Sequence, residues 1–340
     1  MTTKIAINGF GRVGRTALRR LIDSQSSLEV VAINDLAEVD NLAYLYKYDT
    51  AYGRAPYTVE VKDDILTINN YSIKVFHEKD AKNLPWSDLD VDIVIESTGI
   101  YTSTEKAQAH LDAGADKVII TAPANDSSTK TIVFGVNEDI VAGDDKIISA
   151  ASCTTNCLAP LAKALHDNFG IVTGMMSTIK AYTPSQKLHD GPNNDFRRGR
   201  AGAMNAVPTT TGAARAVGKV IPELNGRIDG TAVRVPLLGG ALVEFYTNLD
   251  KKVTVEQVNN AMLEASNASF EYIEDPIVSS DVVGTSAGSI FDATQTEIME
   301  HDGNQLVKTV AWYDSEYGFA SNLVRLVEHF SEIAQKGVDE

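Results

Sequence analysis

Short, nearly continuous apolar runs alternate with amphipathic segments along the first 150 residues. The apolar runs are rich in Ile and Val and comprise residues 5–8, 28–34, 91–95 and 117–121. Segments between them, such as residues 12–23 and 104–113, have the spacing of helices. Apolar strands separated by helices are typical of a parallel sheet covered on both faces. Residues 54–76 instead contain stretches that alternate apolar and polar positions, which predicts a small antiparallel insertion.

Beyond residue 152 the strand-like runs are longer and follow one another. They comprise residues 170–182, 228–235, 241–249, 287–293 and 306–313, and one predicted helix, residues 255–265, follows a cap at Thr254. This pattern predicts an α+β domain with a mostly antiparallel sheet and helices on one face. The last segment, residues 319–334, has amphipathic helical spacing. The change of pattern places a domain boundary near residue 152.

Composition and charge exclude several classes of protein. The formal net charge is −16, which argues against nucleic-acid and anionic-membrane partners, because both require a basic face. No apolar run approaches membrane-spanning length and no leader pattern is visible, so we expect a cytoplasmic protein. Cys153 and Cys157 are the only cysteines, which excludes a disulfide framework. No cluster of His and Cys accompanies them at ligand spacing, so we expect no metal site.

A glycine-rich turn follows the first predicted strand and opens the first predicted helix. Gly9, Gly11 and Gly14 form a G-x-G-x-x-G motif, in which glycines allow a tight turn and let backbone N–H groups approach a pyrophosphate. Asp35 ends the second strand, where a carboxylate can accept hydrogen bonds from a ribose and repel a 2′-phosphate. This arrangement favours NAD over NADP. The alternative is a glycine turn in an unrelated α/β sheet, with Asp35 as a turn residue.

Cys153 follows an apolar run and precedes a helix-like stretch at residues 158–168. It then lies at or near a helix N-terminus, where the helix dipole and free N–H groups stabilise a thiolate. Neighbouring hydroxyl groups can bind an anion or an oxyanion. Pro160 fits a helix badly unless the helix kinks. Taken alone, Cys153 and Cys157 are also compatible with a buried pair of structural thiols.

These motifs resemble the phosphorylating glyceraldehyde-3-phosphate dehydrogenases, and the match runs over nearly the whole chain. The residues that carry it are 7–12, 151–157 (Ala-Ser-Cys-Thr-Thr-Asn-Cys), 207–214, 233–236 and 312–314. The resemblance implies an oxidoreductase with a Rossmann-like, doubly wound NAD-binding domain at residues 1–152 and a catalytic domain at 153–316. It also implies that a C-terminal helix, 317–340, packs back on the first domain, and that the chain forms a homotetramer with residues 180–205 at a subunit contact.

The resemblance further implies a glycolytic reaction in which Cys153 attacks the aldehyde of glyceraldehyde 3-phosphate. Hydride passes to the nicotinamide of NAD, and inorganic phosphate releases the acyl group from the thioester as 1,3-bisphosphoglycerate. A thiolate suits these steps because it is nucleophilic near neutral pH. Residues that match cofactor contacts are Gly9, Gly11, Arg12, Val13, Gly14, Asp35, Lys79, Thr121 and Ser315. Those that match the substrate phosphate are Thr183 and Arg234, and those that match the attacking phosphate are Ser152, Thr154, Arg198, Thr211 and Gly212.

Some of these positions have simpler interpretations. Arg197, Arg198 and Arg200 also fit a solvated charged run or a subunit contact, an interpretation that weighs least for Arg198. Lys79 fits an exposed, solvated lysine.

The chain departs from the family at Lys180, where the family has a histidine that pairs with the thiol and takes the hydroxyl proton. Lysine supplies a permanent positive charge but is a poor base, because its unperturbed pKa is about 10.4. General base catalysis is worth about 10²- to 10⁴-fold, so we expect reduced turnover. Ser315 replaces an asparagine that helps to hold the nicotinamide amide. Phe319 replaces a tyrosine, and residues 237–241 replace a polar run.

Two functions therefore compete. The first is a working, slow dehydrogenase of the glyceraldehyde-3-phosphate type. The second is a catalytically impaired relative that serves as an NAD-binding, redox-sensing or interaction protein through Cys153. The presence of both sets of phosphate-binding residues favours the first, because an impaired relative has no evident need for them.

Overall fold

The computed structural model describes residues 2–336, and contacts along the backbone divide the chain into two compact units. Unit 1 comprises Met1–Phe134, Glu138–Ala151 and Leu323–Glu340, and unit 2 comprises Gly135–Asn137 and Ser152–Asn322. Residues 1 and 337–340, which the predicted first domain and C-terminal helix include, lie outside the described residues. No helix in the described part of the chain is both long enough and apolar enough to cross a membrane.

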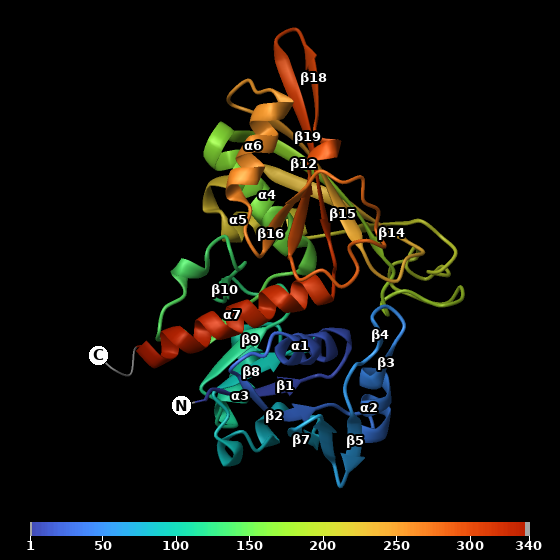
Figure 1. The fold of residues 1–340 in the computed structure, drawn as a ribbon, viewed down its shortest axis with the longest axis vertical. Helices are drawn as coiled ribbons and strands as arrows, with labels where there is room; N and C mark the ends of the chain where they lie inside the picture. Colours follow the sequence, from blue (N-terminus) through green and yellow to red (C-terminus); the bar gives the residue numbers. More distant parts are fainter. Residues whose placement is uncertain (1, 337–340) are drawn as a thin grey trace. The chain divides into compact units, whose positions relative to one another are not determined.

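Unit 1 is built on a nine-stranded sheet with the order β10-β11-β9-β8-β1-β2-β7-β6-β5 (Figure 1). Its central strands are parallel and buried, as the apolar runs predict. They are β1 (Lys4–Asn8), β2 (Glu29–Asn34), β8 (Ile93–Glu96), β9 (Lys117–Ile120) and β11 (Ile147–Ser149). The short strand β10 (Lys130–Thr131) pairs in parallel with β11 at one edge of the sheet. The helices are α1 (Arg12–Asp23), α2 (Val39–Lys47) and α3 (Thr104–Asp112), and the two short strands β3 (Tyr48–Asp49) and β4 (Gly53–Arg54) pair separately.

The predicted antiparallel insertion is part of this sheet rather than a separate piece. Strands β5 (Val59–Lys62), β6 (Ile65–Ile68) and β7 (Tyr71–Phe76) pair antiparallel with one another. However, β7 also pairs in parallel with β2, which joins the insertion to the edge of the main sheet. The side chains of Ile73 and Val75 are buried there, so the alternating pattern reflects one covered and one exposed face.

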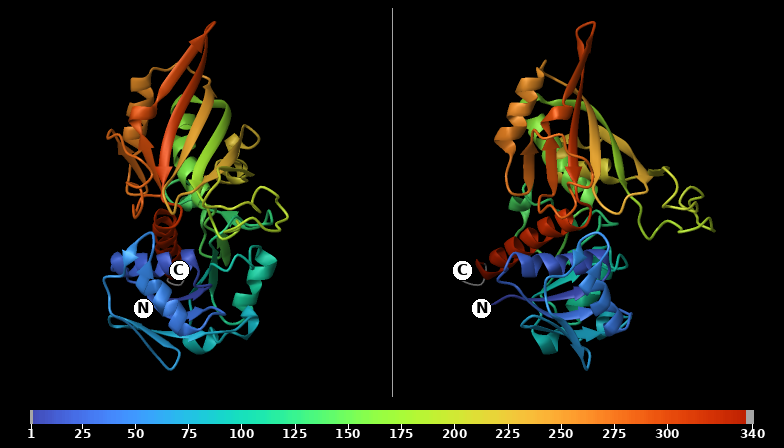
Figure 2. Two further views of the ribbon diagram at one scale, coloured as in Figure 1. Left: turned by 90° about the vertical axis from the view of Figure 1, so that its right-hand side faces the viewer. Right: turned by 45° about the vertical axis from the view of Figure 1, so that its right-hand side comes forward.

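Unit 2 contains an eight-stranded, mostly antiparallel sheet with the order β13-β14-β12-β15-β19-β17-β16, and β18 pairs with β19. The strands are β12 (Ile171–Ala181), β13 (Val207–Thr210), β14 (Ile228–Val235), β15 (Ala241–Leu249), β16 (Phe270–Ile273), β17 (Ser289–Asp292), β18 (Glu297–His301) and β19 (Asn304–Tyr313). Two pairs, β12 with β14 and β16 with β17, are parallel. The long loop between β12 and β13 projects from this sheet (Figure 2, yellow-green).

The helices of unit 2 are α4 (Cys153–Phe169), α5 (Ala213–Val220) and α6 (Val255–Ala265). Helix α4 begins at Cys153, five residues before the predicted helical stretch, because the Ser152 hydroxyl accepts a hydrogen bond from the Thr155 amide at 3.1 Å and caps it. The helix continues through Pro160. The last helix, α7 (Tyr317–Lys336), is slightly longer at both ends than predicted, and it runs from unit 2 into unit 1.

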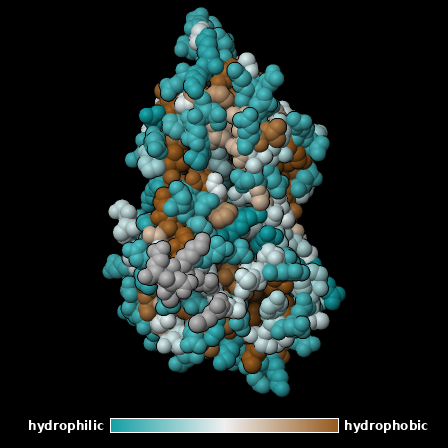
Figure 3. All heavy atoms as spheres, turned by 60° about the vertical axis from the view of Figure 1, so that its left-hand side comes forward, coloured by the Kyte–Doolittle hydropathy of each residue, from teal (hydrophilic) through white to brown (hydrophobic). Residues whose placement is uncertain are grey.

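The surface has the mixed character expected of ordinary globular composition. On the face drawn in Figure 3, hydrophobic residues form separate patches among mostly hydrophilic ones. Several of the most exposed apolar side chains belong to the loop between β12 and β13: Leu188, Phe196 and Met204 are each more than four-fifths exposed.

Candidate active site

The glycine turn of unit 1 is tight on its inner side and open on its outer side. Gly9 has φ +92°, and a Cβ there would lie 2.7 Å from the Thr98 amide nitrogen. A Cβ on Gly14 would lie 2.2 Å from the Gly9 carbonyl oxygen, so α1 packs directly on the turn. Gly11, the N-cap of α1, has no atom within 4 Å of the corresponding position. This open side, next to a helix N-terminus, suits the approach of a pyrophosphate.

Asp35 connects the end of β2 to the turn. Its carboxylate accepts hydrogen bonds from the Phe10 amide at 2.8 Å and from the Ala37 amide at 3.0 Å. The sequence prediction did not foresee this bond to the turn.

The other predicted cofactor residues differ in their contacts and in their exposure. The Arg12 guanidinium forms a two-pronged ion pair with Asp49. Burial alone would raise the pKa of Asp49, but the hydrogen bond from Arg12 holds it below its usual value. Val13 and Thr121 are half-buried, and Lys79 is exposed.

In unit 2, the side chain of Lys180 lies beside the predicted nucleophile. The ammonium is 4.0 Å from the Cys153 sulfur and donates a hydrogen bond to the Thr154 hydroxyl at 3.3 Å. Cys153 is half-buried at the start of α4, whereas Lys180 extends from β12. A helix N-terminus and an ammonium therefore both face the sulfur.

A chain of hydroxyl groups continues from Thr154 into the core. Thr154 and Thr178 each lie 2.9 Å from the buried Tyr313 hydroxyl, and Thr178 donates to the Leu242 carbonyl at 2.9 Å. Since the carbonyl takes the Thr178 proton, Tyr313 must donate to Thr178 and accept from Thr154. Each bond in the chain thus points from Lys180 toward the core. Sequence reasoning noted Tyr313 only as part of a motif, because no local pattern shows that its hydroxyl meets Thr154.

The charges fix the protonation state of Lys180. The negative charge of Cys153 raises the pKa of Lys180 above its usual value, although burial and two arginines oppose the rise. The side chain is therefore an ammonium at neutral pH. Burial raises the pKa of Tyr313 to about 12, so its hydroxyl also stays protonated.

Cys157 lies one turn further along α4 and has a different environment. It is fully buried, and burial raises the pKa of its thiol to about 12. The sulfur lies 3.6 Å from the Ser289 hydroxyl and 3.7 Å from the Ala311 carbonyl. These features make Cys157 an unreactive structural thiol.

Two arginines add positive charge to the same region. Arg234 stands opposite Lys180 in the parallel register of β12 and β14. Its Nη1 donates to Thr183, to Ser185 at 3.2 Å and to Gln186 at 3.4 Å, and its buried Nε has no hydrogen-bond partner within the described residues. Burial, and then the charge of Arg198, lowers the pKa of Arg234. Such a cluster of cations is arranged for an anion.

The remaining predicted phosphate contacts lie near the start of α4 or α5, or on the loop beside β13. Arg198 donates to the Thr209 hydroxyl at 2.6 and 2.8 Å and lies 3.3 Å from Asp195. Thr211 accepts a hydrogen bond from the Ala213 amide at 3.1 Å, next to the exposed Gly212. Thr155 donates to the Ala213 carbonyl at 3.5 Å, which brings the N-termini of α4 and α5 together and with them Ser152.

Ser315 is half-buried in the turn between β19 and α7, and Phe319 is buried with 3% exposure. Within the described residues, no group of three His, Cys, Asp or Glu side chains is arranged to hold a metal ion.

Comparison with known proteins identifies the family of this chain. Residues 3–104 match the NAD binding domain of glyceraldehyde 3-phosphate dehydrogenase, and residues 152–315 match its C-terminal domain. The chain belongs to the glyceraldehyde-3-phosphate dehydrogenase family. It is 55% identical over 335 residues to glyceraldehyde-3-phosphate dehydrogenase of Clostridium pasteurianum, which covers 98% of this chain and all of that protein.

Further relatives give the same result. Glyceraldehyde-3-phosphate dehydrogenase of Streptococcus pyogenes is 55% identical over 338 residues, which covers 98% of this chain and all of that protein. The enzyme of Clostridium acetobutylicum is 54% identical over 334 residues, which covers 98% of this chain and 99% of that protein. The chain is thus an NAD-dependent dehydrogenase of this type, with a Rossmann domain and the family's C-terminal domain. The fold class and the NAD cofactor predicted from the sequence are confirmed.

The two thiols should differ sharply in reactivity. We expect iodoacetamide at pH 7.5 to alkylate Cys153 in the native protein and to leave Cys157 unmodified until the protein is unfolded. Lys180→Gln should slow the alkylation of Cys153 about tenfold, because the variant loses the positive charge beside the sulfur. Mass spectrometry of the two cysteine peptides measures both rates, with Lys187→Gln in the exposed loop as the control. Equal rates in both variants would contradict an influence of Lys180 on Cys153.

Proposed function

We propose that the chain oxidises glyceraldehyde 3-phosphate and phosphorylates the product to 1,3-bisphosphoglycerate, with NAD as hydride acceptor. The observation that carries the proposal is the placement of Cys153 beside Lys180, with Arg198 and Arg234 close enough to affect the pKa of Lys180. A nucleophilic thiol among cations suits a substrate that bears both an aldehyde and a phosphate.

In this proposal, Thr183 and Arg234 bind the substrate phosphate, and the Cys153 thiolate attacks the aldehyde carbon. The carbonyl electrons move to the oxygen, which becomes the hydroxyl or alkoxide of a thiohemiacetal. The thiohemiacetal carbon then loses a hydride, for which NAD would be the acceptor when bound, and its oxygen becomes the carbonyl of a thioester. Inorganic phosphate, held by Arg198 and the start of α5, then attacks the thioester, and the Cys153 thiolate leaves. Ser152 offers a hydroxyl group at the same end of α4, whereas the Thr154 hydroxyl is buried and its proton is directed toward Tyr313.

Lys180 changes the proton chemistry of this sequence. Because it is already protonated, it donates a hydrogen bond to the developing oxyanion but does not remove a hydroxyl proton. Tyr313 offers no substitute, since its hydroxyl donates to Thr178 and its pKa is about 12. We therefore propose a slow enzyme in which hydride transfer draws on the small fraction of ionised thiohemiacetal.

The reaction can be tested in a rapid-mixing experiment with purified protein, NAD, glyceraldehyde 3-phosphate and phosphate. We expect NADH to form, with a first turnover at least as fast as the steady state. A Cys153→Ser variant serves as the control and should form none. If the chain binds NAD but produces no NADH, the proposal fails, and the impaired relative that acts through NAD binding or Cys153 oxidation takes its place.

Lys180→His should raise the steady-state turnover by about 10- to 100-fold, since histidine can act as a base near neutral pH. The variant should also acquire a pH dependence with a midpoint near the ordinary histidine pKa of about 6.5, which the parent lacks because its ammonium does not titrate there. Initial rates between pH 5.5 and 9 provide the measurement. A variant that is no faster than the parent would show that other departures, such as Ser315, limit the reaction.

We also propose that the chain is a cytoplasmic homotetramer. Self-association is supported by three large, exposed apolar side chains on one projecting loop, Leu188, Phe196 and Met204. Covering them with a partner subunit removes apolar surface from water, which stabilises the assembly. Sedimentation should give the mass of four chains, and Phe196→Ser with Met204→Ser should shift it to a smaller species. A parent protein that sediments as a monomer at micromolar concentration would refute the tetramer.

A further inference from the structure

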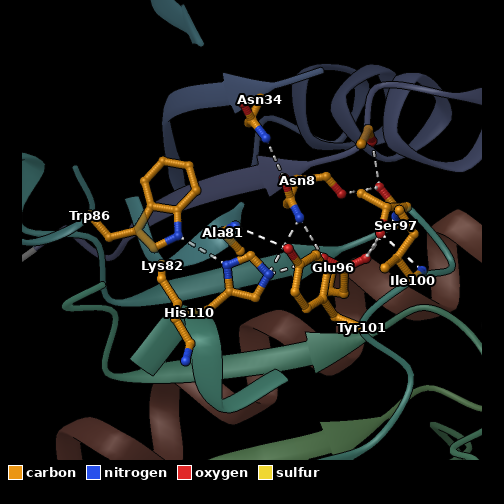
Figure 4. Close-up of polar contacts among 12 residues, drawn as sticks. Asn8, Asn34, Ala81, Lys82, Trp86, Glu96, Ser97, Ile100, Tyr101 and His110 are labelled. Atoms are coloured by element: carbon orange, nitrogen blue, oxygen red, sulfur yellow. Dashed lines mark hydrogen bonds and ion pairs between the residues drawn. The ribbon is translucent and has the colours of Figure 1, made fainter. Parts of the chain in front are cut away.

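Three neighbouring strands of unit 1 end in buried polar side chains. Asn34 on β2, Asn8 on β1 and Glu96 on β8 stand directly opposite one another in the sheet register. Each is at most 5% exposed, and they lie at the carboxyl ends of parallel strands (Figure 4). Burial of these polar groups at the sheet edge destabilises the fold unless their hydrogen bonds are satisfied.

Glu96 is the acceptor on which the cluster converges. One carboxylate oxygen accepts from the amide and the hydroxyl of Thr98, the amide at 2.8 Å. The other accepts from the Asn8 side chain at 2.6 Å and lies 3.0 Å from Nε2 of the fully buried His110. Four donors therefore surround one carboxylate.

The indole of Trp86 fixes the tautomer of His110. Its Nε1 lies 3.1 Å from His110 Nδ1, and an indole nitrogen can only donate. His110 Nδ1 therefore carries no proton, and Nε2 must carry the one that is donated to Glu96. The ring is neutral and acts as a relay between the indole and the carboxylate.

On the other side of Glu96, the hydrogen bonds between side chains also run toward the carboxylate. Since the Asn8 amide nitrogen donates to Glu96, its oxygen is left to accept from the Asn34 amide nitrogen at 2.7 Å. The Asn34 oxygen in turn accepts from the Glu78 backbone amide at 2.8 Å. The hydrogen bonds from Trp86 through His110, and from the Glu78 amide through Asn34 and Asn8, run toward Glu96, while Asn34 Nδ2 also donates to the Glu78 carbonyl at 2.9 Å. Figure 4 shows the contacts among Trp86, His110, Glu96, Asn8 and Asn34. A carboxylate that accepts at both oxygens satisfies these donors.

This cluster lies directly beneath the glycine turn. Ser97 and Thr98 follow Glu96, and the Ser97 hydroxyl donates to the Gly9 carbonyl at 2.5 Å. The Ser97 amide donates to the Asn8 carbonyl at 2.7 Å, and a Cβ on Gly9 would collide with the Thr98 amide nitrogen. The Gly9 amide donates to the Asn34 carbonyl at 2.8 Å. The turn is thus seated on the residues that Glu96 holds.

We propose that Glu96, oriented by His110 and Asn8, is a positioning residue for the cofactor: it holds the glycine turn in the shape that receives the NAD pyrophosphate. Glu96 does not touch the cofactor in this proposal and acts only through Ser97, Thr98 and Asn8. The proposal rests on NAD binding and not on the proposed oxidation of the aldehyde, so the two can fail separately.

Glu96→Gln provides the test, since the amide has nearly the shape of the carboxylate but turns a donor toward Asn8 and His110 or toward Thr98. We expect the dissociation constants of NAD and of ADP-ribose, which both carry the pyrophosphate, to rise about tenfold. The dissociation constant of adenosine should change less than twofold. Isothermal titration calorimetry at pH 7.5 measures all three in the full-length protein.

Leu66→Ala is the matched control, because it removes buried volume from β6 of the same sheet and has no link to the turn. We expect a reduced denaturation midpoint but an unchanged affinity for NAD. Asn34→Ala removes the outermost side chain of the cluster and serves if Glu96→Gln fails to fold, with an expected loss of about threefold. Unchanged NAD affinity in the folded variant, or equal losses for NAD and adenosine, would overturn the proposal.

Discussion

The placement of a permanent cation beside the Cys153 sulfur is the constraint on which the chemistry of unit 2 depends. Two elements enforce it: the capped start of α4 fixes the thiol, and the long strand β12 carries Lys180 to a position 4.0 Å away. The charge of Cys153 in turn raises the pKa of Lys180, which keeps the lysine in its ammonium form. The pair is well suited to create a nucleophile and poorly suited to remove a proton afterwards.

The buried hydroxyl chain through Thr154, Tyr313 and Thr178 complements this pair. A lysine held by a single weak contact would sample several rotamers, and its charge would spread over a larger volume. Here Lys180 donates to Thr154, whose own proton is directed away toward Tyr313. The orientation of Thr154 is therefore set from the core, and it leaves an acceptor for the ammonium. Tyr313 sets the direction of the hydrogen bonds in this chain, because its raised pKa keeps its hydroxyl protonated and therefore a donor.

Much of the fold was predictable, because the signals are local. The apolar runs at residues 5–8, 91–95 and 117–121 identified the central strands, and the change of pattern near residue 152 coincides with the division between the two units. The position of Cys153 at a helix N-terminus was predicted, but the helical stretch was expected only from residue 158, because apolar spacing does not reveal the side-chain bond by which Ser152 caps α4. The pairing of β7 with β2 was also missed, because a strand's partner depends on contacts distant in sequence.

The same distinction explains what was missed at the candidate sites. The motif around Cys153 and the glycine turn are contiguous, so sequence alone pointed to them. Glu96, His110 and Trp86 are separated in the chain, and each has the appearance of an ordinary residue in its own segment. Their role follows only from the direction of the hydrogen bonds that meet at one carboxylate. A protein with a net charge of −16 that binds anions gains nothing from its long-range field, so local groups must supply the attraction. A buried carboxylate beneath a pyrophosphate-binding turn fits this logic, because four donors satisfy it locally and the residues that support the turn are held in place around it.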